Sequence, residues 1–362
     1  MGTTTLSEAY RDHPLHLRHI IPLDFGSTPT VPESHVWPHS DGFSSGDFSG
    51  DLPVVDMRDP DAAELMGRAC ETWGAFQLMG HGIPMKLIEE VELEARKLFG
   101  LPAEQKLKAL RSPGGATGYG VARITPFFTK YMWHEGFTIM GSPIDHAREL
   151  WPHGYQRFCE TMESYQKQMK LLADDLMRIM LKSLNISEQE LSWLANKNLN
   201  QYHPTTAPCT ALQLNSYPSC PDPNRAMGLA PHTDTFLLTV LHQTAQIDGL
   251  QIRKEGGPTG STWVPVRPVN GALVVNVGDL FQILSNGRFT SVVHRVVVNQ
   301  TRRQRFSVAY FYGPPADFAV SPLLSSGQQD QGVVPRYRSV TVKEYVGIKA
   351  KNLDKALSLI KI

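Results

Sequence analysis

Short β-rich segments fill residues 205–315, and this pattern constrains the fold more than any other feature. The segments are rich in β-branched and aromatic residues, and Pro, Gly and Asp separate them. They read TALQLNSY, FLLTVLHQ, GLQIRK, TWVPV, ALVVNVGD, TSVVHRVVVN and RFSVAYFY. Strands of this length and spacing are typical of a jelly roll or sandwich. We therefore predict an α+β protein with a double-stranded β-helix (jelly-roll) core.

Helical periodicity dominates the region that precedes these segments. Apolar residues recur at helical spacing from Ala62 to Trp73 and from Leu87 to Leu98, and a long helix is expected over about 155–184. The last part of the chain, SVTVKEYVGIKAKNLDKALSLIKI, is again helical in pattern. The predicted organisation is a flexible N-terminal extension (1–50), a helix-rich N-terminal domain (51–204), the jelly-roll domain (205–315) and a C-terminal tail with a helix (316–362).

Charge and cysteine content exclude several classes of function. Lys plus Arg and Asp plus Glu number 35 each, so no global field favours nucleic acid or an anionic membrane. No segment reads as a signal peptide or a membrane span. The cysteines are scattered without a Cys-x-x-Cys pair, which argues against a zinc ribbon or dithiol motif. We expect a cytoplasmic monomer without nucleic-acid or membrane partners.

A His-x-Asp sequence occurs twice in the chain. His39 and Asp41 lie within SDGFSSGDFSG and its flank, which resembles a flexible loop, whereas His232 and Asp234 precede the apolar run FLLTVLHQ. His294 lies in the apolar segment SVVHRVVV. Two His and one carboxylate on one face of Fe(II) leave positions open for a co-substrate and oxygen. The sequence therefore predicts a metal site, although a buried strand His is on its own more often a core residue.

Alternation in RFSVAYF places Arg305 and Ser307 on one face of a strand. A cation in an apolar strand is costly to bury unless it meets an anion, and an Arg fork binds carboxylates bidentately. Asn215 and Tyr217 are likewise two residues apart in LQLNSY. These four side chains predict a carboxylate pocket, with a snorkelling surface Arg or a purely structural strand end as the alternatives.

In their order along the chain, Asn-x-Tyr, His-x-Asp, His and Arg-x-Ser resemble the 2-oxoglutarate- and iron(II)-dependent dioxygenases, especially the plant branch. The resemblance extends from about Leu52 to Tyr312 and includes DLPVVDM, WGAFQLMGHGIP and LNSYPSCPDP. It implies Fe(II), 2-oxoglutarate and O2, with ascorbate as reductant. The implied iron ligands are His232, Asp234 and His294. The implied contacts to the distal carboxylate of 2-oxoglutarate are Arg305, Ser307 and Tyr217, with Asn215 orienting a co-substrate.

Three further segments resemble the gibberellin 3-oxidases: PESHVWP, GYGVARITPFFTKYMWHEGFTI and LNSYPSCPDPNRAMGLAPHTDT. That resemblance implies 2-oxoglutarate-dependent 3β-hydroxylation of a diterpenoid carboxylic acid, with release of succinate and CO2. The 2- and 20-oxidases are close relatives. An apolar pocket with one or two cations suits such a substrate. The candidate pocket residues are Arg123, as the carboxylate contact, and Phe127, Tyr131, Met132 and Trp133, each of which is as readily read as core.

Two rival functions remain open at this point. Two His and an Asp also suit zinc with a bound water as nucleophile, which would make the chain a hydrolase. A jelly roll can also be a cupin-type binding or storage protein without turnover. The hydrolase would have no use for Arg305 and Ser307, and the binding protein predicts no turnover and little loss of function when iron is chelated.

Overall fold

Two β-sheets form the centre of the protein. The computed structural model describes residues 10–38, 50–195, 208–257, 260–301, 303–325 and 332–362. The large sheet has the order β1 (Val54–Asp56), β2 (Ala75–Met79), β10 (Leu273–Val277), β7 (Leu238–Gln243), β12 (Arg305–Gly313), β5 (Cys209–Tyr217), β4 (Glu135–Ile139), β3 (Gly118–Gly120). The small sheet has the order β6 (Met227–His232), β11 (His294–Val297), β8 (Leu250–Gly257), β9 (Gly260–Pro265), and β13 (Ala319–Val320) pairs with β14 (Val340–Thr341). This architecture confirms the predicted jelly-roll core.

The large sheet crosses the predicted boundary near residue 205. Strands β1 to β4 come from the N-terminal region, yet β2 pairs with β10 and β4 pairs with β5. Both pairings are antiparallel and in continuous register. Because one hydrogen-bonded sheet contains strands from both regions, 51–204 and 205–315 are parts of a single body within the described chain.

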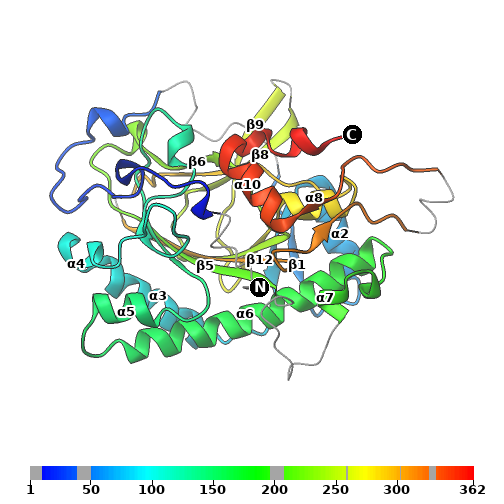
Figure 1. Cartoon of the computed structure of the whole chain (residues 1–362), viewed down its shortest axis with the longest axis horizontal. Coiled ribbons are helices and arrows are strands. Elements are labelled where there is room, and N and C mark those ends of the chain that lie inside the picture. Colours follow the sequence, from blue (N-terminus) through cyan, green and yellow to red (C-terminus); the bar gives the residue numbers. More distant parts are fainter. Residues whose placement is uncertain (1–9, 39–49, 196–207, 258–259, 302, 326–331) are drawn as a thin grey trace.

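Helices cover the outer face of the large sheet. Figure 1 shows α6 running along this face, and α2 and α3 pack on α6. The stripe Phe158, Met162, Tyr165, Met169, Leu172, Leu176 and Met180 is buried at helical spacing, which explains why α6 is long. The α-helices are α2 (Ala62–Thr72), α3 (Met85–Phe99), α4 (Ala103–Leu107), α5 (Ile144–Leu150), α6 (Gln156–Ser183), α7 (Ser192–Ala195), α8 (Asp279–Leu284) and α10 (Val342–Asn352). The 3-10 helices are η1 (Leu17–His19), η2 (Glu33–His35), η4 (Thr125–Phe127), η5 (Glu188–Glu190), η6 (Pro223–Arg225), η7 (Leu353–Lys355) and η8 (Leu357–Ile360).

The N-terminal segment 10–38 differs from the predicted flexible extension. Ile20 is fully buried and its carbonyl accepts a hydrogen bond from the Val121 amide. Trp37 is also buried and its indole N–H donates to the Tyr131 carbonyl at 2.8 Å. The Pro, Ser and His content predicted a flexible loop, and the segment has little regular secondary structure. Its buried apolar side chains nevertheless attach it to the rest of the protein. His39 and Asp41 lie outside the described residues.

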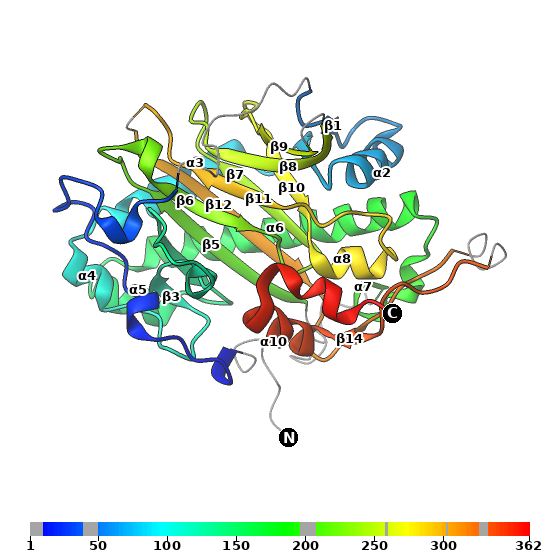
Figure 2. The same cartoon turned by 90° about the horizontal axis from the view of Figure 1, so that it is seen from above.

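The C-terminal region contains the predicted helix, α10, which packs back on the body. Thr341 caps it, since its hydroxyl accepts a hydrogen bond from the Glu344 amide at 3.1 Å. Tyr345 and Val346 are buried. Figure 2 shows α10 next to α8, on the opposite side of the large sheet from α6. The helix therefore lies where it can wall the space between the sheets.

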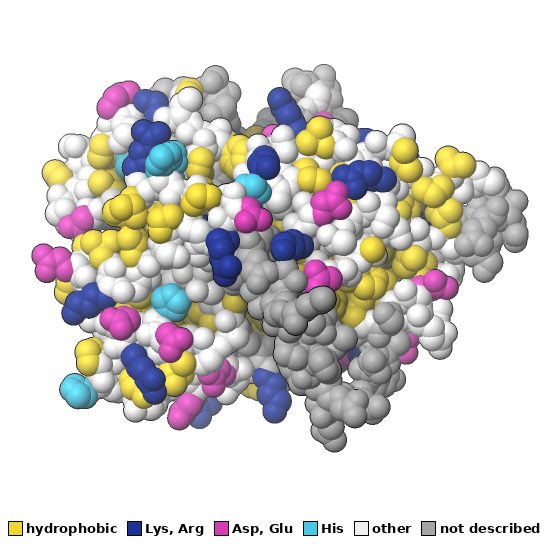
Figure 3. All heavy atoms as spheres, in the orientation of Figure 1, with side chains coloured by type: hydrophobic (Ala, Val, Ile, Leu, Met, Phe, Trp, Pro, Cys, Tyr) yellow, Lys and Arg dark blue, Asp and Glu magenta, His cyan; other side chains and the backbone are white. Residues whose placement is uncertain are grey.

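Surface charge and helix composition agree with the balanced sequence. Basic and acidic side chains are interspersed over the face seen in Figure 3. In the described part of the chain, no helix combines the length and the apolar character needed to cross a bilayer.

Candidate active site

Two histidines lie side by side on adjacent strands of the small sheet. His232 is the last residue of β6 and His294 is the first of β11, and the antiparallel register pairs them directly. Their ring centroids are 4.3 Å apart. Asp234 follows β6 in the loop before β7, with its Oδ1 atom 3.8 Å from His232 Nε2 and 3.7 Å from His294 Nε2. The predicted triad is thus assembled, and the strand that positions the His-x-Asp pair is β6, which ends at His232.

Hydrogen bonds hold both imidazoles in the orientation that a metal site needs. His232 Nδ1 lies 2.8 Å from the Ala230 carbonyl and His294 Nδ1 lies 3.2 Å from the Val292 carbonyl. A carbonyl accepts only from N–H, so each Nδ1 carries the proton and each Nε2 lone pair faces Asp234. One atom from each of the three residues lies within 4.8 Å of the others, which leaves one ion room between them.

Burial sets the charge state of the triad. Burial and then the neighbouring His294 lower the pKa of the His232 imidazole to about 3. His232 is therefore neutral at pH 7, the form that binds metals. Burial acts to raise the pKa of the Asp234 carboxyl, but the two imidazoles and the polar Thr239 and Asn276 side chains outweigh it, so this pKa lies below its ordinary value. One carboxylate and two imidazole nitrogens make a suitable donor set for Fe(II).

The predicted carboxylate pocket is assembled on the large sheet. The β12–β5 register places Arg305 opposite Tyr217 and Ser307 opposite Asn215. The guanidinium carbon of Arg305 lies 5.1 Å from the Tyr217 ring centroid, and Asn215 Nδ2 donates to Ser307 Oγ at 3.3 Å. Since residues paired in register share a face, the four polar side chains line one patch.

Unpartnered polar atoms identify where ligands are required. Arg305 is 1% exposed, and its Nη2 donates to Gln243 Oε1 at 2.8 Å, but its Nε and Nη1 atoms have no partner. Asp234 Oδ2 is also buried without a partner. Buried polar groups are normally paired, so these atoms fit a bound carboxylate and a bound cation. The residues present therefore fit both iron and 2-oxoglutarate.

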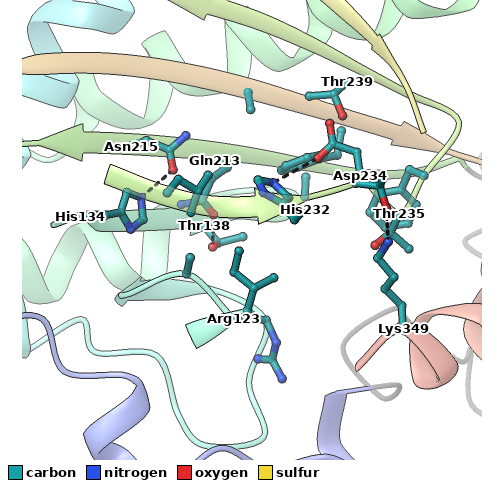
Figure 4. A pocket seen from close by; sticks show the side chains of 18 of the residues that line it. Arg123, His134, Thr138, Gln213, Asn215, His232, Asp234, Thr235, Thr239 and Lys349 are labelled. Carbon is teal, nitrogen blue, oxygen red and sulfur yellow. Dashed lines mark hydrogen bonds and ion pairs between the residues drawn. The ribbon is translucent and has the colours of Figure 1, made fainter. Parts of the chain in front are cut away.

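One cavity between the two sheets joins these two sites. Its walls include the triad, Asn215, Tyr217, Arg305 and Ser307. Figure 4 shows His232 and Asp234 on one side of it, and His134, just before β4, next to Asn215 of β5. Apolar side chains supply most of the remaining wall: Leu15, Ala116, Ala122, Ile124, Phe127, Met140, Ala211, Leu229, Phe236, Leu241, Leu250, Val296, Ala309, Phe311, Val346, Ala350 and Leu353.

The predicted substrate residues divide into two groups. Arg123 and Phe127 line the cavity. Trp133 and Met132 do not: Trp133 is fully buried in a cluster with Cys220 and Ala226, and Met132 packs against Trp37 and Met227. Tyr131 also lies away from the cavity, beside the rings of His19 and His35. Met132 and Trp133 are therefore core residues, whereas Tyr131 is half-buried. All three contact the N-terminal segment, through Trp37, Phe25 and His35 respectively.

Several residues that line the cavity or contact its lining were not identified from the sequence. Gln243 ends β7 and orients Arg305, while Thr239 and Asn276 flank Asp234. Lys349 reaches from α10 to the loop that carries Asp234 (Figure 4), donating to Thr233 Oγ1 and Asp279 Oδ2 at 2.5 Å each. No local pattern marks such residues, since each depends on a pairing distant in sequence.

The jelly roll and its buried His-Asp-His triad, next to an unpaired arginine fork, define the class of mononuclear non-haem iron oxygenases. The family model described as "2OG-Fe(II) oxygenase superfamily" matches residues 208–314, and "non-haem dioxygenase in morphine synthesis N-terminal" matches residues 52–156. The chain belongs to the 2OG-Fe(II) oxygenase superfamily, whose members use Fe(II), 2-oxoglutarate and O2.

Curated relatives and solved structures agree with this membership. The chain is 51% identical to gibberellin 3-beta-dioxygenase 1 of Pisum sativum, over 99% of this chain and 94% of that protein. It is 47% identical to gibberellin 3-beta-dioxygenase 1 of Arabidopsis thaliana, over 98% of each. Its structure is similar to that of JOX2 in complex with 2OG, Fe and JA, with a TM-score of 0.73 and 27% identity, covering 88% of this chain and 89% of that one. The rice dioxygenase for auxin oxidation gives a TM-score of 0.68 and 28% identity, covering 86% and 100%.

Proposed function

We propose that this enzyme hydroxylates gibberellin precursors at the 3β position. The observation that carries the proposal is the 51% identity to the pea gibberellin 3-beta-dioxygenase over nearly the whole of both chains. The apolar cavity walls support it, because a gibberellin is a rigid apolar polycycle with one carboxylate. When bound, iron and 2-oxoglutarate supply the oxidising power: the co-substrate is converted to succinate and CO2 as O2 is consumed and the substrate gains a hydroxyl.

The residues of the chain have separate tasks in this scheme. His232, Asp234 and His294 would hold iron through two imidazole nitrogens and one carboxylate. Arg305 binds the distal carboxylate of 2-oxoglutarate through its free Nε and Nη1 atoms, with Ser307 and Tyr217 beside it. Asn215 positions Ser307. The apolar walls exclude water from the reacting centre, which protects reactive species from side reactions.

Product analysis tests the proposed activity. Purified protein is incubated with Fe(II), ascorbate, 2-oxoglutarate, O2 and gibberellins that lack a 3-hydroxyl, and products are identified by mass spectrometry. We expect 3β-hydroxylated product with an equal amount of succinate. Oxidation at carbon 2 or 20 would assign the chain to a neighbouring activity. Hydrolysis under nitrogen would indicate a zinc hydrolase, and binding without turnover would indicate a cupin-type binding protein.

Replacing Arg305 with Lys should weaken 2-oxoglutarate binding. Lys keeps the charge but loses the planar fork, so at least one charge-assisted hydrogen bond is lost. Such a bond contributes about 1.5–3 kcal/mol, so the Kd should rise about ten- to a hundredfold. Calorimetric titration under nitrogen measures this Kd. Arg303→Lys is the matched control, because Arg303 is exposed and two residues away; equal affinities for the two variants would contradict the assigned role of Arg305.

We also propose that the enzyme acts as a monomer in the cytoplasm. All four cysteines, Cys70, Cys159, Cys209 and Cys220, are free of disulfides, which is typical of proteins in a reducing compartment. Light scattering of the purified protein tests the monomer, and imaging of a fluorescent fusion tests the location.

A further inference from the structure

Arg111 is a buried cation on the cavity wall, between α4 and β3. Its side chain lines the cavity and the residue is 3% exposed. Nη2 donates to the Val121 carbonyl at 2.7 Å, and Nε is buried without a partner. Burial lowers the pKa of the guanidinium to about 9, which still leaves it charged at neutral pH. Its backbone amide donates to the Tyr119 carbonyl, which ties the Arg111 backbone to β3.

No carboxylate compensates this charge within the described chain. The titratable neighbours that act on Arg111 are Arg123, which is also a cation, and Tyr10, whose phenol is neutral at neutral pH because burial raises its pKa. Arg123 is similarly placed: Nη1 donates to the Gly115 carbonyl at 2.6 Å, and its guanidinium carbon lies 4.0 Å from the Tyr10 ring centroid. Figure 4 shows the Arg123 guanidinium directed away from His232. Two arginines thus share one end of the cavity.

The charges along the whole cavity make this surplus clear. Among the described lining residues the cations are Arg111, Arg123, Arg305 and Lys349, and Asp234 is the sole carboxylate. Lys349 pairs with Asp279, Asp234 belongs to the metal triad, and 2-oxoglutarate satisfies Arg305. Arg111 and Arg123 are left over. Arg111 is nearly fully buried, and a buried cation without an anionic partner is costly, so an anion from outside the chain would compensate its charge.

We propose that Arg111, supported by Arg123, is the binding site for the carboxylate of the organic substrate, separate from the arginine that binds 2-oxoglutarate. The inference rests on the proposed function and names the part of the cavity that recognises its substrate class. Ala122, Ile124 and Phe127, close to Arg123 in the chain, and Leu15, hydrogen-bonded to Pro113, also line the cavity, so the ligand the site fits is an apolar carboxylic acid. Arg123, the cation that the sequence suggested for this contact, becomes the supporting residue, because Tyr10 and Gly115 already engage it.

A line of polar side chains connects this site with the co-substrate pocket. Asn215 contacts Ser307, and Asn215 Oδ1 lies 3.0 Å from His134 Nε2. His134 in turn is buried, has an unpartnered Nδ1 and feels the charge of Arg111. The two anion sites therefore border one continuous wall formed by β4 and β5. A substrate held by its carboxylate at Arg111 keeps its apolar body inside the cavity that contains the triad.

Comparison of free acids with their methyl esters tests the proposal. The holoenzyme with Fe(II) and 2-oxoglutarate is titrated under nitrogen with a gibberellin lacking the 3-hydroxyl and with its methyl ester. We expect the acid to bind about ten- to a hundredfold more tightly than the ester, which is the value of a charge-assisted hydrogen bond. Arg111→Gln should remove most of this preference, and Arg123→Gln should reduce it. Equal binding of acid and ester by the unaltered enzyme would overturn the proposal.

Further variants separate the carboxylate contact from a structural role. Arg111→Lys keeps a donor for the Val121 carbonyl and should retain part of the acid preference even where Arg111→Gln folds poorly. Arg148→Gln, on α5 and outside the cavity lining, should leave the preference unchanged. Unchanged 2-oxoglutarate affinity in folded variants shows that the effect is local. If Arg111→Gln and Arg111→Lys both keep the full acid preference, the proposal is wrong.

The same titration distinguishes this inference from the proposed function. Jasmonic acid and indole-3-acetic acid, with their methyl esters, are titrated alongside the gibberellin. If gibberellin fails to bind but another acid shows an acid-over-ester preference that depends on Arg111, the gibberellin assignment fails and the anion site stands. If gibberellin is hydroxylated with no such preference, the function stands and the anion site fails.

Discussion

Replacing either His232 or Asp234 with Ala should nearly abolish iron binding and hydroxylation. Each change removes one of the three atoms that lie within 4.8 Å of one another, and no other described His, Cys, Asp or Glu joins this group. Even changes to groups that only orient a metal ligand cost about ten- to a hundredfold, so loss of a ligand should cost more than about a hundredfold. Metal analysis after gel filtration and succinate formation measure the two losses.

His39→Ala is the matched control for this prediction. It makes the same change in the other His-x-Asp sequence, His39 and Asp41. We expect normal iron content and activity. A His232→Ala protein that retained as much iron as His39→Ala would contradict the ligand assignment. A His39→Ala protein without iron would show that the His39-x-Asp41 sequence also contributes to iron binding.

The ligands could be found in the sequence because their chemistry is carried by residue type and strand alternation. Arg305 and Ser307 were expected on one face, and the β12–β5 register now places Tyr217 and Asn215 opposite them. The direct pairing of His232 with His294 was not predictable, because register depends on how β6 and β11 meet across a gap of many residues. Strand β6 itself was missed, since GLAPH contains Gly and Pro, which weaken a strand pattern.

The substrate end of the cavity was harder to predict for a physical reason. Aromatic composition alone does not distinguish a core from a cavity wall, and Trp133 and Met132 proved to be core. Arg111 lies in the stretch ALRSPGG, whose Ser, Pro and Gly residues are typical of a surface loop. In the fold this stretch is hydrogen-bonded to β3, and Arg111 is buried there. The burial of a cation is decided by tertiary packing, so the sequence cannot report it.

Lys349 on α10 forms a buried ion pair that joins the C-terminal helix to the metal-binding loop. Its Nζ atom donates to Asp279 Oδ2 and Thr233 Oγ1, and Thr233 lies between His232 and Asp234. Asp279 is fully buried and also accepts from Tyr345 and Ser291, while its amide donates to the Asp234 carbonyl. These contacts connect α10 with the backbone of Asp234, a proposed metal ligand. Both the stability of the protein and its iron affinity should therefore depend on the Lys349 side chain.

Lys349→Met should therefore lower the free energy of unfolding by about 3–5 kcal/mol, because it leaves the Asp279 carboxylate buried without its cation. Met preserves most of the side-chain length, so lost packing contributes little. Iron affinity should fall in the same variant, since the Thr233 loop loses its anchor. Urea unfolding of the metal-free protein measures the first effect and metal titration measures the second.

Lys351→Met, an exposed position on the same helix, is the control and should change the unfolding free energy by less than about 0.5 kcal/mol. Adding Asp279→Asn to Lys349→Met should restore part of the lost stability, because the double variant no longer buries an uncompensated charge. Equal stability of the Lys349→Met and Lys351→Met proteins would show that the ion pair contributes nothing. A stability loss without a change in iron affinity would mean that α10 holds the fold together without positioning the metal loop.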